Sequence, residues 1–137
     1  MAGETDRVRM IAGMRPHLLP GEVVFVAAPQ HLLAALRPRA TVVEPEGVSA
    51  VVDRDDADEA GLEYGFVGAW ITLRLHSALD GVGLTAAVST ALADAGIAAN
   101  VIAGLHHDHV VVPHAEGARA VAVLDALAAS ARRSTPR

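Results

Sequence analysis

The chain has 137 residues, enough for one ordinary domain or two very small ones, and its 52% hydrophobic and 3% aromatic content predicts a core of valine, leucine, isoleucine and alanine. The net charge is −5, and the 11 basic residues are arginines scattered along the chain, which excludes the basic stripe of a nucleic-acid-binding protein. The chain has no cysteine, which excludes disulfides, thiolate metal sites and cysteine nucleophiles and favours a protein of the reducing cytoplasm.

The first half of the chain shows five short elements behind a polar leader. Residues 1–9 contain no apolar signal core, and we expect them to form a flexible end. The expected elements are a strand over 22–28 after the turn signal Pro20-Gly21, a helix over about 30–36, strands over 41–43 and 47–52, and a short acidic helix capped by Asp53 and stopped by Gly61. This half therefore has the order strand, helix, strand, strand, helix.

The second half shows the same order more clearly. Residues 70–76 alternate, with Ile71, Leu73 and Leu75 on one face and Thr72, Arg74 and His76 on the other, which predicts a strand with one face on a core. Asp80 stands at the N-cap of a helix that ends at Gly96 and has Leu84, Val88, Ala91, Leu92 and Ala95 at helical spacing. Strands are expected over 97–104 and 106–113, a closing helix over 115–130 with Ala120, Leu124 and Leu127 buried, and a flexible tail over 131–137.

Two such halves predict an α+β protein of the ferredoxin-like (βαββαβ) type, with antiparallel sheets and the helices packed on one face. The longest weakly polar stretch, residues 81–104, is interrupted by polar side chains and changes its period midway. We therefore expect neither a membrane span nor a membrane partner.

The stretch from Ser77 to Gly104, SALDGVGLTAAVSTALADAGIAANVIAG, resembles the core signature of ACT domains, in which a turn with aspartate and glycine precedes a helix and a second glycine opens the next strand. The whole chain looks like the small bacterial proteins with two ACT domains, because MRPHLLPGEVVF at 14–25 and DHVVVP at 108–113 match their openings and strands. Val82 departs from the pattern, since many ACT turns have proline there. The resemblance implies a degenerate ACT-like half over 10–66 and an ACT domain over 67–130.

This resemblance also implies a function. ACT domains commonly bind small effectors, often amino acids, at the interface between paired domains, and many are fused to metabolic enzymes. A chain of 137 residues has no room for a fused enzyme. We therefore expect a stand-alone regulatory or sensor protein that is not an enzyme, needs no cofactor and can form a homodimer.

The candidate ligand-binding residues form two groups and one isolated position: Asp80, Gly81, Val82, Gly83 and Leu84; Gly104, Leu105, His106, His107 and Asp108; and Asn100. Free backbone amides at a helix start can hold a ligand carboxylate. Asp108 can accept hydrogen bonds from a ligand ammonium, with backbone groups of Gly104–His107 beside it. The alternative is purely structural, because Asp80 can simply cap its helix and Asp108 can simply turn a hairpin.

Two further alternatives involve the histidines. His106, His107, His109, Asp108 and His114 contain metal-ligand side chains, but neighbours along a strand point to opposite faces, so we expect no metal site. A Ser–His–Asp enzyme is disfavoured, because His76 and Ser77 point apart and no nucleophile-elbow motif accompanies them. The alternative function is a non-catalytic dimerisation or protein-interaction module that has no ligand of its own, since both halves are rich in apolar residues.

Overall fold

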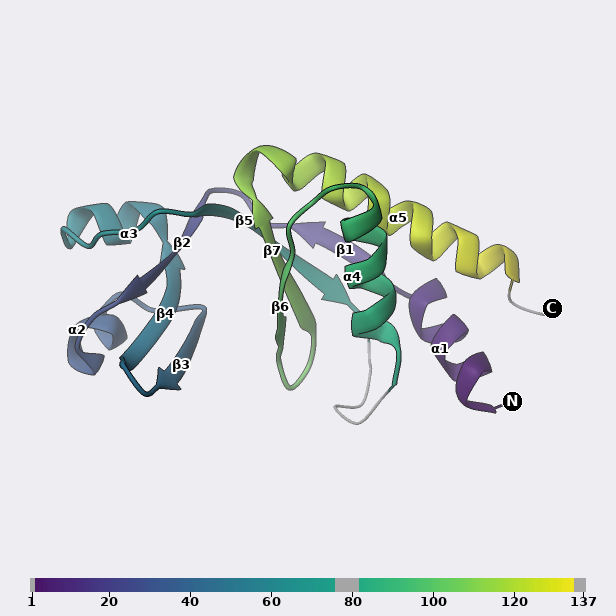
Figure 1. Ribbon diagram of the computed structural model, residues 1–137, viewed down its shortest axis with the longest axis horizontal. Helices are drawn as coiled ribbons and strands as arrows, with labels where there is room; N and C mark the ends of the chain where they lie inside the picture. The colour runs from purple at the N-terminus through teal and green to yellow at the C-terminus, as the bar shows by residue number, and fades with distance from the viewer. Residues whose placement is uncertain (1, 76–81, 135–137) are drawn as a thin grey trace. The chain divides into compact units, whose positions relative to one another are not determined.

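The computed structural model describes residues 2–75 and 82–134 (Figure 1). Its elements in chain order are α1 (Ala2–Ala12), β1 (Arg15–Leu18), β2 (Val23–Ala27), α2 (Gln30–Ala35), β3 (Ala40–Glu44), β4 (Gly47–Asp53), α3 (Arg54–Glu59), β5 (Val67–Arg74), α4 (Leu84–Asp94), β6 (Asn100–Ala103), β7 (Asp108–Pro113), the single 3-10 turn η1 (His114–Glu116) and α5 (Gly117–Ser134). The chain divides into unit 1, residues 1–19 and 70–137, and unit 2, residues 20–69. The predicted α+β, ferredoxin-like class is confirmed.

Unit 2 is one βαββαβ module. Its strands lie in the order β3-β4-β2-β5, and the β2–β4, β3–β4 and β2–β5 pairs are antiparallel. The alternation of β2 and β4 puts one set of valines and alanines on the face that the two helices cover. That core consists of Val24, Val26, Leu33, Ala50, Val52 and Ala57, all at most 3% exposed. Because its side chains are small, the helices pack close to the sheet.

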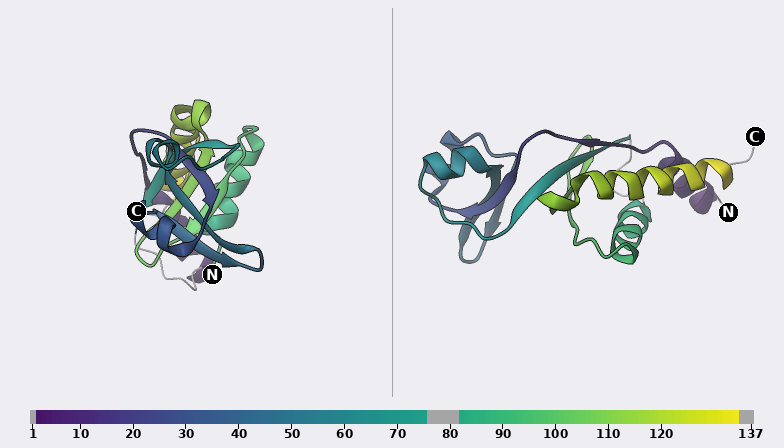
Figure 2. Two further views of the ribbon diagram at one scale, coloured as in Figure 1. Left: turned by 90° about the vertical axis from the view of Figure 1, so that its left-hand side faces the viewer. Right: turned by 90° about the horizontal axis from the view of Figure 1, so that it is seen from above.

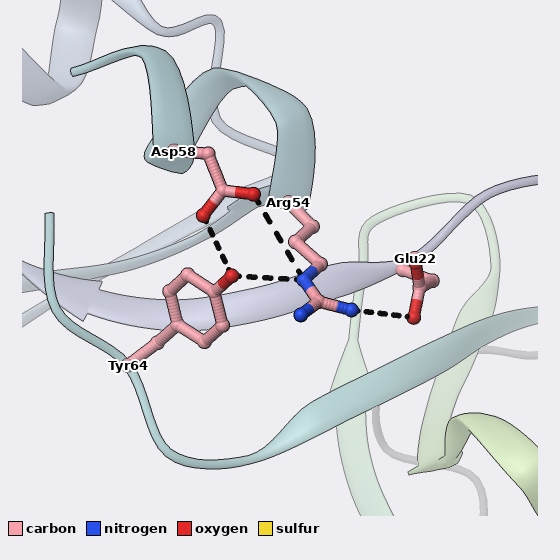
Figure 3. A network of polar contacts seen from close by, with 4 residues as sticks. All are labelled: Glu22, Arg54, Asp58 and Tyr64. Carbon is pink, nitrogen blue, oxygen red and sulfur yellow. Dashed lines mark hydrogen bonds and ion pairs between the residues drawn. The ribbon is translucent and has the colours of Figure 1, made fainter. Parts of the chain in front are cut away.

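A polar network closes the corner of unit 2 where β4 passes into α3 (Figure 3). Arg54 donates from Nε to the Tyr64 hydroxyl at 2.8 Å and from Nη1 to Glu22 at 3.0 Å. The Tyr64 hydroxyl in turn donates to Asp58 at 2.6 Å. These bonds fix the loop between α3 and β5 against the start of β2. The predicted cap, Asp53, does occupy the N-cap of α3, but its side chain makes no capping bond and instead pairs with Arg39 at 3.1 Å.

Unit 1 repeats the module with one change in connectivity. Its strands lie in the spatial order β1-β5-β7-β6. Along the chain, β5, α4, β6, β7 and α5 follow one another, but the edge strand beside β5 is β1, which comes from the N-terminal segment. β1 pairs antiparallel with β5 from Arg15↔Arg74 to Leu18↔Ile71. The predicted apolar face of β5 is confirmed, since Ile71 and Leu73 are at most 1% exposed.

Helices lie near both ends of the described residues. Residues 2–12 form α1, which packs on α5, and Figures 1 and 2 show it beside the C-terminal part of that helix. α5 itself continues to Ser134. Residues 10–19 lie in unit 1. Ile11 and Met14, apolar residues of the N-terminal segment, are buried there.

Smaller differences concern element limits in unit 1. β6 begins only at Asn100, because Gly96 ends α4 with a φ of +74° and the chain needs Ile97–Ala99 to return to the sheet. In α5 the buried stripe is Ala120, Leu124 and Ala128, and the expected Leu127 is only half-buried. Among the described residues, no helix is both long and apolar enough to cross a bilayer.

Candidate functional site

One end of unit 1 gathers most of the described residues predicted to bind a ligand. Thr72 on β5 contacts His109 on β7 at 3.0 Å, and the ring of His107 lies 3.4 Å from the carbonyl oxygen of Leu75. The later residue of β5 lies beside the earlier residue of β7, so the two strands are antiparallel. The start of β7 lies beside the end of β5, where the chain leads into α4. In Figure 1 the start of α4 and the β6–β7 turn lie at this same end of the unit.

The start of α4 has the features expected of a carboxylate site. Gly83 is the N-cap residue, with a φ of +104° that favours glycine, and it provides no side-chain cap. The first-turn amides from Leu84 onward have no carbonyl partner within the helix and carry its partial positive charge. Val82, just before them, is 84% exposed. Asp80 and Gly81 lie outside the described residues.

Arg7 also lies at this site, although no sequence pattern predicts it there. A Cβ atom at position 83 would overlap the Arg7 side chain, whose Cγ, Cδ and Nε atoms all lie against Gly83. Helix α1 thus brings a guanidinium group to the first turn of α4. No sequence pattern could reveal this contact, because the two residues are distant in the chain and meet only through the packing of α1.

The β6–β7 turn forms the other side of this end of unit 1. Its backbone is closed by the Gly104 amide, which donates to the His107 carbonyl at 2.9 Å. A Cβ at position 104 would lie 2.7 Å from that carbonyl oxygen, so the turn requires glycine. Leu105 is 74% exposed at the tip and His106 is exposed beside it. Asp108, half-buried, starts β7 opposite Ala103.

Asn100 does not join this group. It pairs with Val111 at the far end of the β6–β7 hairpin, and its side-chain amide donates to the Val111 carbonyl at 3.3 Å. Four residues of strand separate it from Gly104, which corresponds to about 13 Å.

The face of β5 opposite Ile71 and Leu73 carries a polar network that includes the Thr72–His109 contact. Trp70 donates from Nε1 to the Thr72 hydroxyl at 3.1 Å, and its ring lies 4.9 Å from that of His109. Because the indole only donates, the Thr72 hydroxyl is free to donate to His109 Nδ1, which favours the neutral ring with its proton on Nε2. Burial lowers the pKa of His109 below its usual 6.5, His107 lowers this pKa further, and Asp108 opposes the shift.

The lowered pKa of His109 predicts a pH dependence of stability. The unfolded chain binds the proton more readily than the folded one, so the free energy of unfolding falls as the pH drops below 6.5 and is retained above it. His109→Phe keeps a ring against Trp70 and removes this titration. Urea unfolding at several pH values on either side of 6.5 should give a shallower pH dependence for the variant; parallel profiles would contradict the assignment.

Two other candidate sites can be compared with this one. Among the described residues, no three His, Asp or Glu side chains come together in a way that could hold a metal ion. Unit 2 has an open surface hollow of about 610 Å³, lined by Ala35, Leu36, Arg37, Asp53, Asp56, Glu59 and Ala60. The hollow contains none of the residues that the sequence predicted to bind a ligand.

Comparisons with known proteins agree with the fold of both units. A family model described as ACT domain matches residues 2–69, and a second ACT domain model matches residues 66–126. No curated protein matches the chain. The chain is 39% identical to a Vibrio cholerae protein of unknown function, described as a possible transport protein, with a TM-score of 0.83 over 92% of this chain and 98% of that one.

More distant solved structures share the fold. An Agrobacterium tumefaciens protein is 16% identical, with a TM-score of 0.63 over 84% of this chain and 89% of that one. The regulatory subunit of aspartate kinase from Thermus flavus is 14% identical, with a TM-score of 0.61 over 82% and 95%. With two matching family models in tandem and a relative at 39% identity over nearly the whole chain, this protein belongs to the ACT domain family.

Proposed function

We propose that this protein is a non-catalytic regulator that binds a small zwitterionic effector, an amino acid, at the end of unit 1 formed by the start of α4 and the β6–β7 turn. The observation that carries the proposal is that groups of opposite charge lie at this one end. Backbone amides and Arg7 lie at the start of α4, and the half-buried Asp108 begins β7.

Each charged group of an amino acid has a matching partner in this arrangement. The effector carboxylate accepts hydrogen bonds from the first-turn amides of α4, where the helix dipole favours an anion, and the Arg7 guanidinium adds a second positive charge. The effector ammonium donates to the Asp108 carboxylate. The exposed side chains of Val82 and Leu105 are then available to contact an apolar effector side chain.

A regulatory role is supported by the family rather than by the site alone. ACT domains are regulatory modules, and structures with this fold include a regulatory subunit of aspartate kinase, although that likeness is one of fold only. The class of effector is therefore proposed from the chemistry of the site and not from the name of any neighbour.

Thermal unfolding of the full chain against the twenty amino acids tests the proposal. An effector at 100 times its dissociation constant should stabilise the protein by about 2.7 kcal/mol. The methyl ester and the deaminated analogue of any hit are the matched controls, because each removes one of the two charges and should lose the stabilisation. If no amino acid stabilises the chain, or if both analogues bind as well as the parent, the proposal is wrong.

A further inference from the structure

Two arginines stand directly opposite each other on neighbouring strands of unit 1. β1 pairs antiparallel with β5 (Figure 1), and the register places Arg15 opposite Arg74 and His17 opposite Thr72. Residues directly opposite each other in such a pair lie on the same face of the sheet, with their Cβ atoms about 5 Å apart. The two guanidinium groups therefore leave the sheet side by side, on the face opposite the buried side chains of β5.

No carboxylate compensates the charge of either arginine. Arg15 and Arg74 are exposed, and among the described residues neither forms an ion pair. Arg15 donates from Nη1 to the carbonyl oxygens of Met14 at 3.0 Å and Ala12 at 3.3 Å. These bonds hold one end of its guanidinium group against uncharged partners, so the positive charge and the Nε and Nη2 donors stay available to a ligand.

The strands around the two arginines add no negative charge to this face. Asp108 is the one acidic residue in the four strands of unit 1. Its neighbour His109 contacts Thr72 on the face that carries the arginines, so alternation turns Asp108 to the other face. His17 is exposed two residues along β1 from Arg15 and has a ring N–H that can donate. The strand residues at this end of the face are therefore cationic or able to donate hydrogen bonds.

The arginine pair opposes the stability of the sheet unless an anion lies between the two groups. Like charges at directly opposite positions of an antiparallel pair are destabilising. An anion that accepts hydrogen bonds from both guanidinium groups replaces this repulsion with two attractions. A phosphate group suits the pair, because its charge of about −2 balances both arginines. Its oxygens also match the fork of guanidinium donors, which binds phosphate through two parallel hydrogen bonds.

We propose that Arg15 and Arg74, with His17 beside them, form a binding site for the phosphate group of a small phosphorylated molecule. The two guanidinium groups donate to oxygens on opposite sides of the phosphorus, and the imidazole of His17 donates to a further oxygen. None of these three residues belongs to the proposed effector site, so this inference does not depend on the proposed function. Because the residues are exposed, binding should weaken as the salt concentration rises.

Isothermal titration calorimetry with inorganic phosphate and with pyrophosphate, at neutral pH and constant ionic strength, tests the site. The full chain should bind both anions, and Arg74→Gln should raise the dissociation constants about tenfold or more, because one charge-assisted contact is lost. Arg133→Gln is the matched control, since Arg133 is exposed on α5 of the same unit and away from the two strands. It should leave the constants within about a factor of two of wild type. No binding by the wild type, or equal weakening by both variants, would overturn the proposal.

A second measurement separates a phosphate site from general screening of surface charge. Urea unfolding of the wild type is compared in pyrophosphate and in succinate, a dicarboxylate, at matched ionic strength. Pyrophosphate should stabilise the wild type more than succinate does, and Arg74→Gln should lose this difference. Without either anion the variant should be at least as stable as the wild type, because it no longer repels Arg15, which also shows that it folds. Equal stabilisation of both proteins by the two salts would refute a phosphate site.

Discussion

Replacing Met14 with alanine is expected to lower the free energy of unfolding of unit 1 by about 2–5 kcal/mol. Met14 connects α1 to β1 and is fully buried. Truncating it leaves a cavity in the part of the core that the N-terminal segment completes. Urea unfolding followed by the fluorescence of Trp70 measures the effect, because the chain's one tryptophan lies in unit 1.

Met10 provides the matched control for this prediction. It undergoes the same chemical change on α1 but is only half-buried, so Met10→Ala should cost about 1 kcal/mol or less. If the two variants lose the same small amount of stability, the N-terminal segment is not part of the core of unit 1. A large loss for Met14→Ala alone confirms that residues far apart in the chain share one hydrophobic core.

The second large effect concerns the proposed effector site. Asp108→Asn keeps the size and shape of the side chain but removes the charge that pairs with an effector ammonium. Charge-assisted hydrogen bonds contribute more than neutral ones, so we expect the dissociation constant of the stabilising amino acid to rise by about tenfold or more. Isothermal titration calorimetry on the wild type and the variant gives the ratio directly.

A control for Asp108 is available on α5. Asp125 is exposed on that helix and is not among the residues of the proposed site, so Asp125→Asn removes the same charge from the protein without touching the site. It should leave the dissociation constant within about a factor of two of wild type, as a screened surface charge does. Equal weakening by both variants would mean that the effect comes from net charge and not from a contact at residue 108.

The sequence predicted the central elements well, because their patterns are local. The alternation of Ile71 and Leu73, the turn signals at Gly61 and Gly96, and the spacing of Leu84, Val88 and Leu92 each depend on a few neighbouring residues, and all match the structure. The fold class followed from their order.

The N-terminal elements were not predictable in this way. α1 has charged residues around most of its circumference, and β1 is only four residues long and contains Pro16, so neither shows the periodicity of its class. Both form because tertiary packing against α5 and β5 outweighs weak local preference. The contact of Arg7 with Gly83 follows from this packing and was invisible for the same reason. Asn100 lies at the end of the β6–β7 hairpin away from the turn, where its side-chain amide donates to the Val111 carbonyl.

The position of β1 has a consequence for how the chain is made. Residues 1–19 are synthesised before β5, α4 and α5, the elements against which they pack. Residues 20–69 have all their own strands as soon as β5 emerges, so the inserted module can fold during translation. Residues 1–19 reach all of their packing partners only after α5 has been made, so unit 1 completes its core later than the module inserted within it.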